Sequence, residues 1–166
     1  MKKLYLILIS FFILMSCGNN LKKDTLLQFV NEKEAQCDSI KQLPESNKKI
    51  VTDFYQQMFG DKDISAVDKY ISSDEYIQHN PTVADGAEAF KEAAKGWFEG
   101  APTTKVDIQR IAAEGDLVFI HIKDIKPDGS LQSVIDIFRL KDGKIVEHWD
   151  VMQDVPKEAA NDHPMF

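Results

Sequence analysis

The sequence contains none of the short motifs that mark several large enzyme classes. It has no glycine-rich phosphate-binding loop, no HExxH or CxxC ligand pair, and no G-x-S-x-G nucleophile turn. No tight spacing of histidine, cysteine or carboxylate supports a metal site either. We therefore expect no metal and no cofactor. The side chains that remain for chemistry are carboxylates and imidazoles, which are suited to moving protons.

Cysteine and positive charge are also scarce. There are 2 cysteines, Cys17 and Cys37, and 20 Lys and Arg against 27 Asp and Glu, which gives a net charge of −7. This charge argues against a nucleic-acid partner and against attraction to an acidic membrane surface. The remaining composition, 43% hydrophobic and 28% charged, is ordinary for one globular domain.

The N-terminus has the pattern of a bacterial lipoprotein. Lys2 and Lys3 precede an apolar run, Leu4 to Met15, that is too short to span a bilayer. Its end, Leu14-Met15-Ser16-Cys17, resembles the bacterial lipobox; an ordinary secretory signal with an incidental cysteine is the alternative. The resemblance implies a signal peptide over 1–16, a lipidated Cys17, and a location in the bacterial cell envelope, facing the periplasm or exterior. Membrane contact would be through the lipid anchor only, and Cys37 would have no disulfide partner.

The rest of the chain divides by composition and periodicity. We expect a polar tether over 17–45, a domain over 46–154 and a C-terminal tail over 155–166. Within the domain, apolar residues at helical spacing start after Ser46, and further helices start near Asp63 and Asp85. Four strands follow, over 104–111 and 117–126 and in a hairpin over 134–152. Helices followed by an antiparallel meander predict an α+β domain, with three helices packed on a curved antiparallel sheet around one pocket.

The hairpin carries acidic and imidazole groups that an ordinary buried strand would not tolerate: Asp136, His148 and Asp150. With a two-residue loop, Asp136 would face away from the other two side chains. A three-residue loop pairs Leu140 with Lys144, which sets Asp136 across from His148 with Asp150 diagonal to it. We predict the three-residue loop. The simplest form of the preceding turn also sets His121 across from Asp136.

Three segments resemble the SnoaL-like polyketide cyclase family of the NTF2-like superfamily, whose folds are cone-shaped and α+β. They are DIFRLKDGKIVEHWDVMQ, YIQHNPTVADGAEAF at 76–90 and LVFIHIKD at 117–124. In the cyclases, the carboxylate that matches Asp150 is a general acid/base. It removes a proton alpha to a carbonyl and later protonates the new alkoxide of an intramolecular aldol closure. Asp136 departs from the family, which has a histidine at that position.

The candidate catalytic residues are Asp150, Asp136, His148 and His121. A strand-end carboxylate in solvent is the alternative for Asp150, and a structural link to a histidine is the alternative for Asp136. His79 and Asn80 are expected at a pocket rim, although Asn80-Pro81 also suits a simple turn. Four aromatic residues are candidates for the ligand-binding wall, with an ordinary core as the alternative: Trp97, Phe119, Phe138 and Trp149.

Three functions remain open at this point. The first is cofactor-free acid/base chemistry, an aldol-type cyclisation or isomerisation, on a small and mostly apolar carbonyl compound. The second is a non-catalytic module that binds a small ligand, because a fold does not fix its chemistry. The third and weakest is a metal site. A homodimer is left open.

Overall fold

The computed structural model describes the backbone of residues 2–166 and the side chains of residues 23–166. The chain divides into two compact units, Met1–Gln42 and Leu43–Phe166, which are described separately. The side chain of Cys17 lies outside the described residues, so its lipidation and the signal peptide stay predictions. Within the part of the chain that the structure describes, no helix is long and apolar enough to cross a membrane.

Helix α1 (Lys2–Tyr55) belongs to both units and includes the segment 17–45, which we expected to be a polar tether. Pro44 lies inside the helix, so Ser46 does not begin it. Leu, Lys, Glu and Gln make up nearly half of residues 17–45, and all of them favour helix. Exposed ion pairs one turn apart, such as Lys41–Asp38 at 3.5 Å, add a few tenths of a kcal/mol each.

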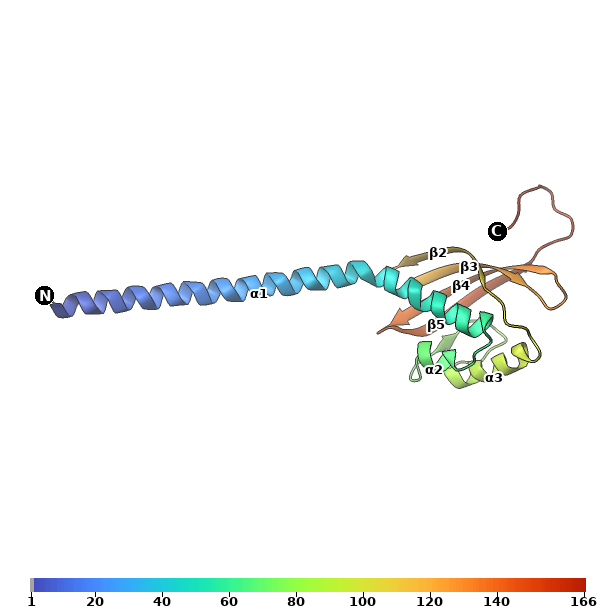
Figure 1. Ribbon diagram of the computed structural model, residues 1–166, viewed down its shortest axis with the longest axis horizontal. Coiled ribbons are helices and arrows are strands. Elements are labelled where there is room, and N and C mark those ends of the chain that lie inside the picture. Colours follow the sequence, from blue (N-terminus) through green and yellow to red (C-terminus); the bar gives the residue numbers. More distant parts are fainter. Residues whose placement is uncertain (1) are drawn as a thin grey trace. The chain divides into compact units, whose positions relative to one another are not determined.

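The second unit has the α+β architecture expected from the sequence (Figure 1). After α1 come a π-helical turn η1 (Gln56–Gly60), α2 (Ala66–Tyr70), β1 (Ile77–Gln78) and α3 (Ala87–Phe98). Four strands follow: β2 (Asp107–Glu114), β3 (Leu117–Ile125), β4 (Leu131–Lys141) and β5 (Lys144–Asp154).

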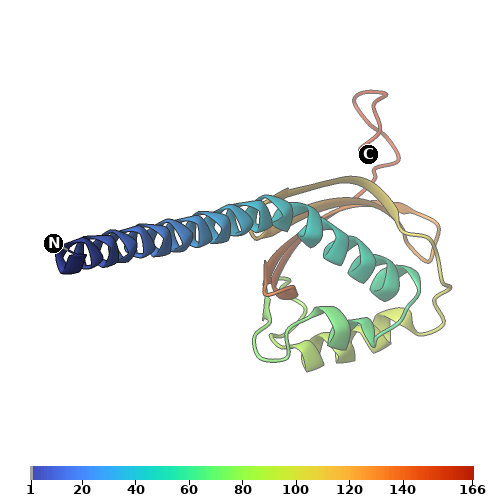
Figure 2. The same cartoon turned by 60° about the vertical axis from the view of Figure 1, so that its left-hand side comes forward.

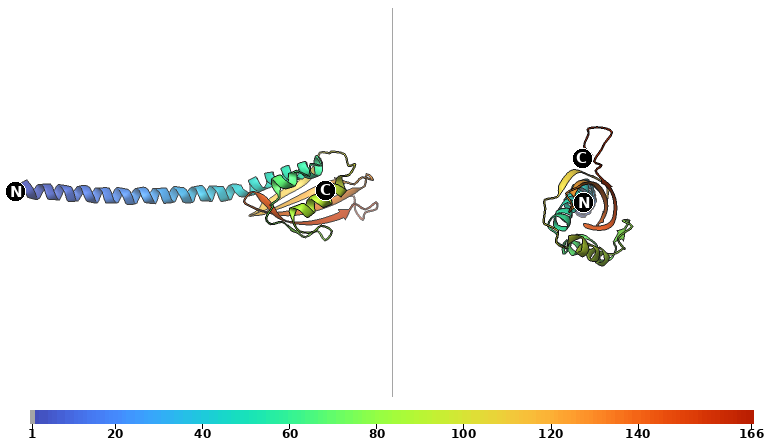
Figure 3. Two further views of the ribbon diagram at one scale, coloured as in Figure 1. Left: turned by 90° about the horizontal axis from the view of Figure 1, so that it is seen from below. Right: turned by 90° about the vertical axis from the view of Figure 1, so that its right-hand side faces the viewer.

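The sheet is mixed, where we expected a purely antiparallel one. Its order is β1-β5-β4-β3-β2, and β1 pairs with β5 in the parallel direction. We expected the segment around Ile77 to be extended but did not place it in the sheet. The sheet curves around the helical side of the unit, as Figure 2 and the end-on view in Figure 3 show. Its two faces are therefore called inner, toward the helices, and outer.

The core lies between the inner face and the helices. Phe54 of α1 is fully buried and packs edge-on against Phe138 of β4, with ring centroids 5.9 Å apart. Phe90 of α3 lies 6.5 Å from the same Phe54 ring. Val118 and Ile120 of β3 complete the contact from the sheet, both at most 1% exposed. Side chains that share the inner face with Phe138 and Ile120 are consequently held close to α1.

The β4–β5 hairpin does not have the predicted three-residue loop. Lys141 pairs with Lys144 across Asp142-Gly143, and both loop residues have positive φ (52° and 76°), as in a type I′ turn. One step further, the register shifts: Leu140 pairs with Ile145 but Arg139 pairs with Glu147. Val146 is thus the extra residue of a β-bulge.

The bulge returns the predicted residues to one face. Asp136, His148 and Asp150 all lie on the inner face, as the three-residue loop would also have placed them. Their partners differ, however, because Asp136 lies directly across from Asp150 and His148 lies across from Phe138. The prediction of the shared face is correct and the prediction of the pairing is wrong.

The preceding hairpin has a register that we did not predict. Ile125, and not Lys126, pairs with Leu131, so the connection is one residue longer than expected. It is closed by hydrogen bonds from Lys126 N–H to Ser130 O (2.9 Å) and from Gly129 N–H to Lys126 O (2.8 Å). A one-residue slip moves a side chain to the other face. His121 accordingly pairs with Ile135 on the outer face and does not lie across from Asp136.

Candidate functional site

The centre of the candidate site is a hydrogen-bonded pair on the inner face. His148 Nε2 lies 2.8 Å from Asp136 Oδ1, and the two residues are only 7% and 5% exposed. The second carboxyl oxygen, Asp136 Oδ2, accepts a hydrogen bond from the Tyr55 hydroxyl of α1 at 2.8 Å. A buried carboxyl group is costly unless it is paired and hydrogen-bonded, and this one has both kinds of partner.

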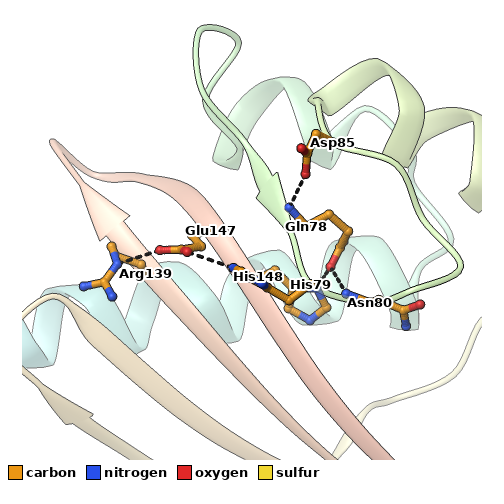
Figure 4. A network of polar contacts seen from close by, with 7 residues as sticks. All are labelled: Gln78, His79, Asn80, Asp85, Arg139, Glu147 and His148. Carbon is orange, nitrogen blue, oxygen red and sulfur yellow. Dashed lines mark hydrogen bonds and ion pairs between the residues drawn. The ribbon is translucent and has the colours of Figure 1, made fainter.

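Gln78 of β1 holds the other side of the imidazole ring. Its Oε1 lies 2.8 Å from His148 Nδ1 and also accepts the backbone N–H of Asn80 at 3.0 Å. The backbone N–H of Gln78 in turn donates to Asp85 Oδ1 at 2.8 Å, just before α3. Figure 4 shows Gln78 between Asp85 on one side and His148 and Asn80 on the other. The imidazole therefore has a polar partner at each ring nitrogen.

Asp150 is the more accessible of the two carboxyl groups. It is half-buried, directly across the sheet from Asp136. The Asn80 side chain donates from Nδ2 to Asp150 Oδ2 at 2.6 Å. Among the described residues, this is the only hydrogen bond of the Asp150 side chain. Asp150 Oδ1 is therefore left for a ligand. A half-buried carboxylate held by one donor, with its other oxygen without a protein partner among the described residues, can serve as a general base.

Two buried tyrosines border this cluster, and both keep their protons. Burial, and then the nearby Asp136 carboxyl, raise the pKa of Tyr55 well above its ordinary value. The same two causes raise the pKa of Tyr76. The Tyr55 hydroxyl is therefore a donor to Asp136 at every physiological pH.

Three of the predicted site residues lie on the outer face instead. Phe119 pairs with Ile137, and Ile137 pairs with Trp149 on its other side. His121 contacts Arg110 Nη1 (3.1 Å) and Ser133 Oγ (2.9 Å). Burial and the Arg110 charge lower the pKa of His121. The structure therefore does not bring Phe119, His121 or Trp149 to the Asp136–His148 pair, because each has the opposite orientation in its strand.

His79 also belongs to the outer face. Its ring stacks on Trp149, with centroids 4.6 Å apart and planes at 3°, and its Nε2 lies 2.9 Å from Glu147 Oε1. Arg139 Nε donates to Glu147 Oε2 at 2.8 Å, as seen in Figure 4. Burial alone would raise the pKa of Glu147, but the hydrogen bonds from Arg139 and His79 outweigh it and hold the pKa below its ordinary value. This group is a compact ion-paired cluster, separate from the inner-face site.

The remaining aromatic candidates divide between core and surface. The Phe138 ring stacks on His148 with centroids 4.8 Å apart, but it is 2% exposed and belongs to the core, as the alternative for this residue had it. Trp97 is 47% exposed on α3 and contacts Phe90, so it is not part of the cluster. Sequence reasoning missed Tyr55 and Gln78. Gln78 precedes the predicted His79 in an extended segment, and side-chain alternation would have pointed to it once β1 was placed beside β5.

The same side chains include a potential ligand set for a cation. One donor atom each from Asp136, His148 and Asp150 lie within 4.8 Å of one another. His148 Nε2 and Asp136 Oδ1, however, already face each other at hydrogen-bond distance. A cation would have to replace the proton between them, so the geometry fits an acid/base cluster better than a metal centre.

The comparisons with known proteins agree with this fold. The family model described as "SnoaL-like polyketide cyclase" matches residues 49–161, well over half of the chain. No curated protein matches the chain closely enough to count as a relative.

Solved structures are similar at the level of fold. TsrD from Streptomyces laurentii is 22% identical, with a TM-score of 0.54, over 65% of this chain and 88% of that one. A proposed polyketide cyclase from Acidithiobacillus ferrooxidans is 22% identical, with a TM-score of 0.55, over 64% and 87%. An epoxide hydrolase from M. tuberculosis, described as LEH-like, is 20% identical, with a TM-score of 0.54, over 66% and 84%. The chain belongs to the SnoaL-like polyketide cyclase family and has the NTF2-like α+β fold.

Proposed function

We propose that the domain binds a small, mostly apolar carbonyl compound against the inner face of the sheet and catalyses cofactor-free proton transfer on it. Asp150 is the general acid/base of an aldol-type cyclisation or an isomerisation. One observation carries the proposal: the half-buried Asp150 carboxylate lies across from the buried Asp136–His148 pair. The buried Phe138 ring, stacked on His148, holds the imidazole in place from the core side.

The cyclisation needs no co-reactant. Asp150 takes a proton from the carbon alpha to a carbonyl, and the electron pair of that C–H bond enters the enolate. The enolate carbon forms a bond to a second carbonyl carbon of the same molecule, whose oxygen becomes an alkoxide. The proton on Asp150 then moves to that alkoxide, so Asp150 ends as it began. For isomerisation of a β,γ-unsaturated carbonyl compound, the same proton removal gives a conjugated dienolate, and Asp150 returns the proton to its γ carbon.

The first step has a direct assay. Exchange of alpha protons for deuterium in D₂O is followed by NMR over a panel of small 1,3-dicarbonyl compounds and cyclic ketones. We expect the full chain to speed exchange on at least one of them. Asp150→Asn should reduce this by about 10²–10⁴-fold, the usual contribution of a positioned acid/base.

The matched control is Asp142→Asn. It makes the same chemical change in the β4–β5 turn, where Asn-Gly suits a type I′ turn. Its exchange rate should equal that of the wild type. Equal rates for Asp150→Asn and the wild type would contradict the role of Asp150. A compound that binds both proteins without any exchange would establish the non-catalytic binding module instead.

We also propose that the chain is a lipoprotein of the bacterial cell envelope, anchored through Cys17. Support comes from Lys2 and Lys3, the apolar run after them, and the Leu14-Met15-Ser16-Cys17 sequence. After expression in a bacterial host, mass spectrometry should find a chain that begins at a lipidated Cys17 and partitions into detergent. Cys17→Ser should remain in the aqueous phase. A wild-type chain with an unmodified Cys17 would exclude the anchor.

A further inference from the structure

We propose that Gln78 is a positioning residue that keeps a proton on Nδ1 of His148. The mobile proton of the site then lies between His148 Nε2 and Asp136 Oδ1. The inference rests on the proposed function, because it specifies how the acid/base site is held. It also stands on contacts that are independent of any substrate.

The orientation of the Gln78 side-chain amide is decided by a backbone group. Oε1 accepts the Asn80 N–H at 3.0 Å, and a backbone N–H is always a donor. If the amide were flipped, its NH₂ group would face that N–H, donor against donor. In the observed orientation, Gln78 Nε2 donates to the Tyr76 hydroxyl at 3.2 Å. The atom that faces His148 Nδ1 at 2.8 Å is therefore an acceptor, and Nδ1 must carry the proton.

The main chain holds Gln78 in this place. β1 runs parallel to β5, and Gln78 is the direct partner of His148. The next residue, His79, donates its backbone N–H to the carbonyl oxygen of His148 at 2.9 Å. The Gln78 backbone N–H is fixed by Asp85 at 2.8 Å. The two-residue strand thus places an amide oxygen against the imidazole from the edge of the sheet.

The other ring nitrogen shares a proton with Asp136. The Tyr55 hydroxyl donates to Asp136 Oδ2, so that oxygen is an acceptor. The 2.8 Å contact between Asp136 Oδ1 and Nε2 then needs one proton. The proton can lie on nitrogen, as imidazolium and carboxylate, or on oxygen, as imidazole and carboxylic acid. In both forms the pair has no net charge, which leaves Asp150 as the carboxyl group that exchanges a proton with a ligand.

Nitrogen NMR of the histidine rings tests the assignment without any substrate. The full chain is labelled with ¹⁵N-histidine, and the His148 signals are identified as those missing from His148→Gln. In the wild type, we expect Nδ1 of His148 to resonate in the protonated range at neutral and mildly alkaline pH. In Gln78→Leu the buried Nδ1–H would have no acceptor, which costs about 1–3 kcal/mol. The ring should then lose that proton, and the Nδ1 signal should move to the unprotonated range.

Two further variants separate positioning from general structural damage. Gln78→Glu keeps an acceptor for both N–H groups and should keep Nδ1 protonated. Tyr55→Phe removes a different hydrogen bond of the same network and should leave the Nδ1 signal in the protonated range. An unprotonated Nδ1 in the wild type would overturn the inference by itself, even if Gln78→Leu failed to fold. A protonated Nδ1 in a folded Gln78→Leu protein would show that Gln78 does not fix it. Neither result depends on whether Asp150 supports proton exchange.

Discussion

Tyr55→Phe removes a single hydrogen bond from the buried cluster while keeping the aromatic ring. The lost oxygen lies 2.8 Å from Asp136 Oδ2, and both residues are at most 7% exposed. The phenylalanine ring can occupy the same space beside Phe59, whose centroid is 4.7 Å away. The change therefore isolates the hydroxyl group.

The magnitude follows from what the hydroxyl contacts. Hydrogen bonds to charged groups contribute about 1.5–3 kcal/mol, and a buried acceptor left without its donor incurs a desolvation cost of similar size. We expect Tyr55→Phe to lower the free energy of unfolding by about 1.5–3 kcal/mol at neutral pH. Urea denaturation followed by tryptophan fluorescence and by far-UV circular dichroism measures this change.

Alkaline pH should reduce the difference between the two proteins. The pKa of Tyr55 in the folded protein is above the ordinary 10.0, so its contribution is fully present below pH 10. Above pH 10 the unfolded tyrosine loses its proton while the folded one keeps it, so the wild type loses stability as pH rises. The loss from this one group is about 1.4 kcal/mol per pH unit. Tyr55→Phe lacks this pH-dependent loss. The free energies of unfolding of the two proteins, plotted against pH, should therefore converge above pH 10.

The matched control is Tyr70→Phe. Tyr70 is equally buried, at 7% exposed, but its hydroxyl accepts from the neutral amide of Gln57 at 2.6 Å. A neutral hydrogen bond contributes about 0.5–1.5 kcal/mol, so this variant should lose less stability. If Tyr55→Phe costs no more than Tyr70→Phe, or if its curve runs parallel to that of the wild type above pH 10, the reasoning about the buried cluster is wrong.

Three other perturbations test the remaining contacts. Gly143→Ala should lower the free energy of unfolding by about 1–2 kcal/mol, because a φ of 76° is strained for any residue with a Cβ; an unchanged urea midpoint would contradict the type I′ turn. Arg110→Ala should raise the pKa of His121 toward its ordinary 6.5 by removing the nearby positive charge, and NMR titration that finds no rise would show that burial alone lowers it. Treatment with EDTA should leave the melting temperature unchanged, because the atoms of Asp136 and His148 that would bind a cation bind each other; a fall of several degrees, reversed by one divalent metal, would establish a metal centre.

Periodicity was sufficient to predict the architecture. Apolar residues at helical spacing before Gly100 and alternating strands after Thr104 identified the helices and the four long strands in their observed order. It was not sufficient for β1, because two residues are too few to show alternation. The parallel pairing of β1 with β5 depends on backbone contacts between distant segments. Such contacts leave no local pattern in the sequence.

The inner-face cluster was predicted through an incorrect register. The sequence favoured a three-residue loop, and the structure has a two-residue loop with a bulge at Val146. Either arrangement places Asp136, His148 and Asp150 on one face of the sheet. Their shared face was therefore predictable, but which of them lie directly across from each other was not. For His121 no bulge compensates, and a one-residue error moved it from the inner to the outer face. Tyr55 was missed because its partner, Asp136, is 81 positions away in the chain.

The bulge also determines how the length of this hairpin can vary. Val146 is the residue of β5 that has no partner in β4, so its deletion would leave Ile145 opposite Leu140 and Glu147 opposite Arg139. Deletion of a residue between 147 and 150 has a different effect, because every β5 side chain on one side of the deletion would move to the other face of the sheet. Homologous chains that differ by one residue in this hairpin are therefore expected to carry the gap at position 146, next to the turn. The strand segment that contains His148 and Asp150 should keep a constant length.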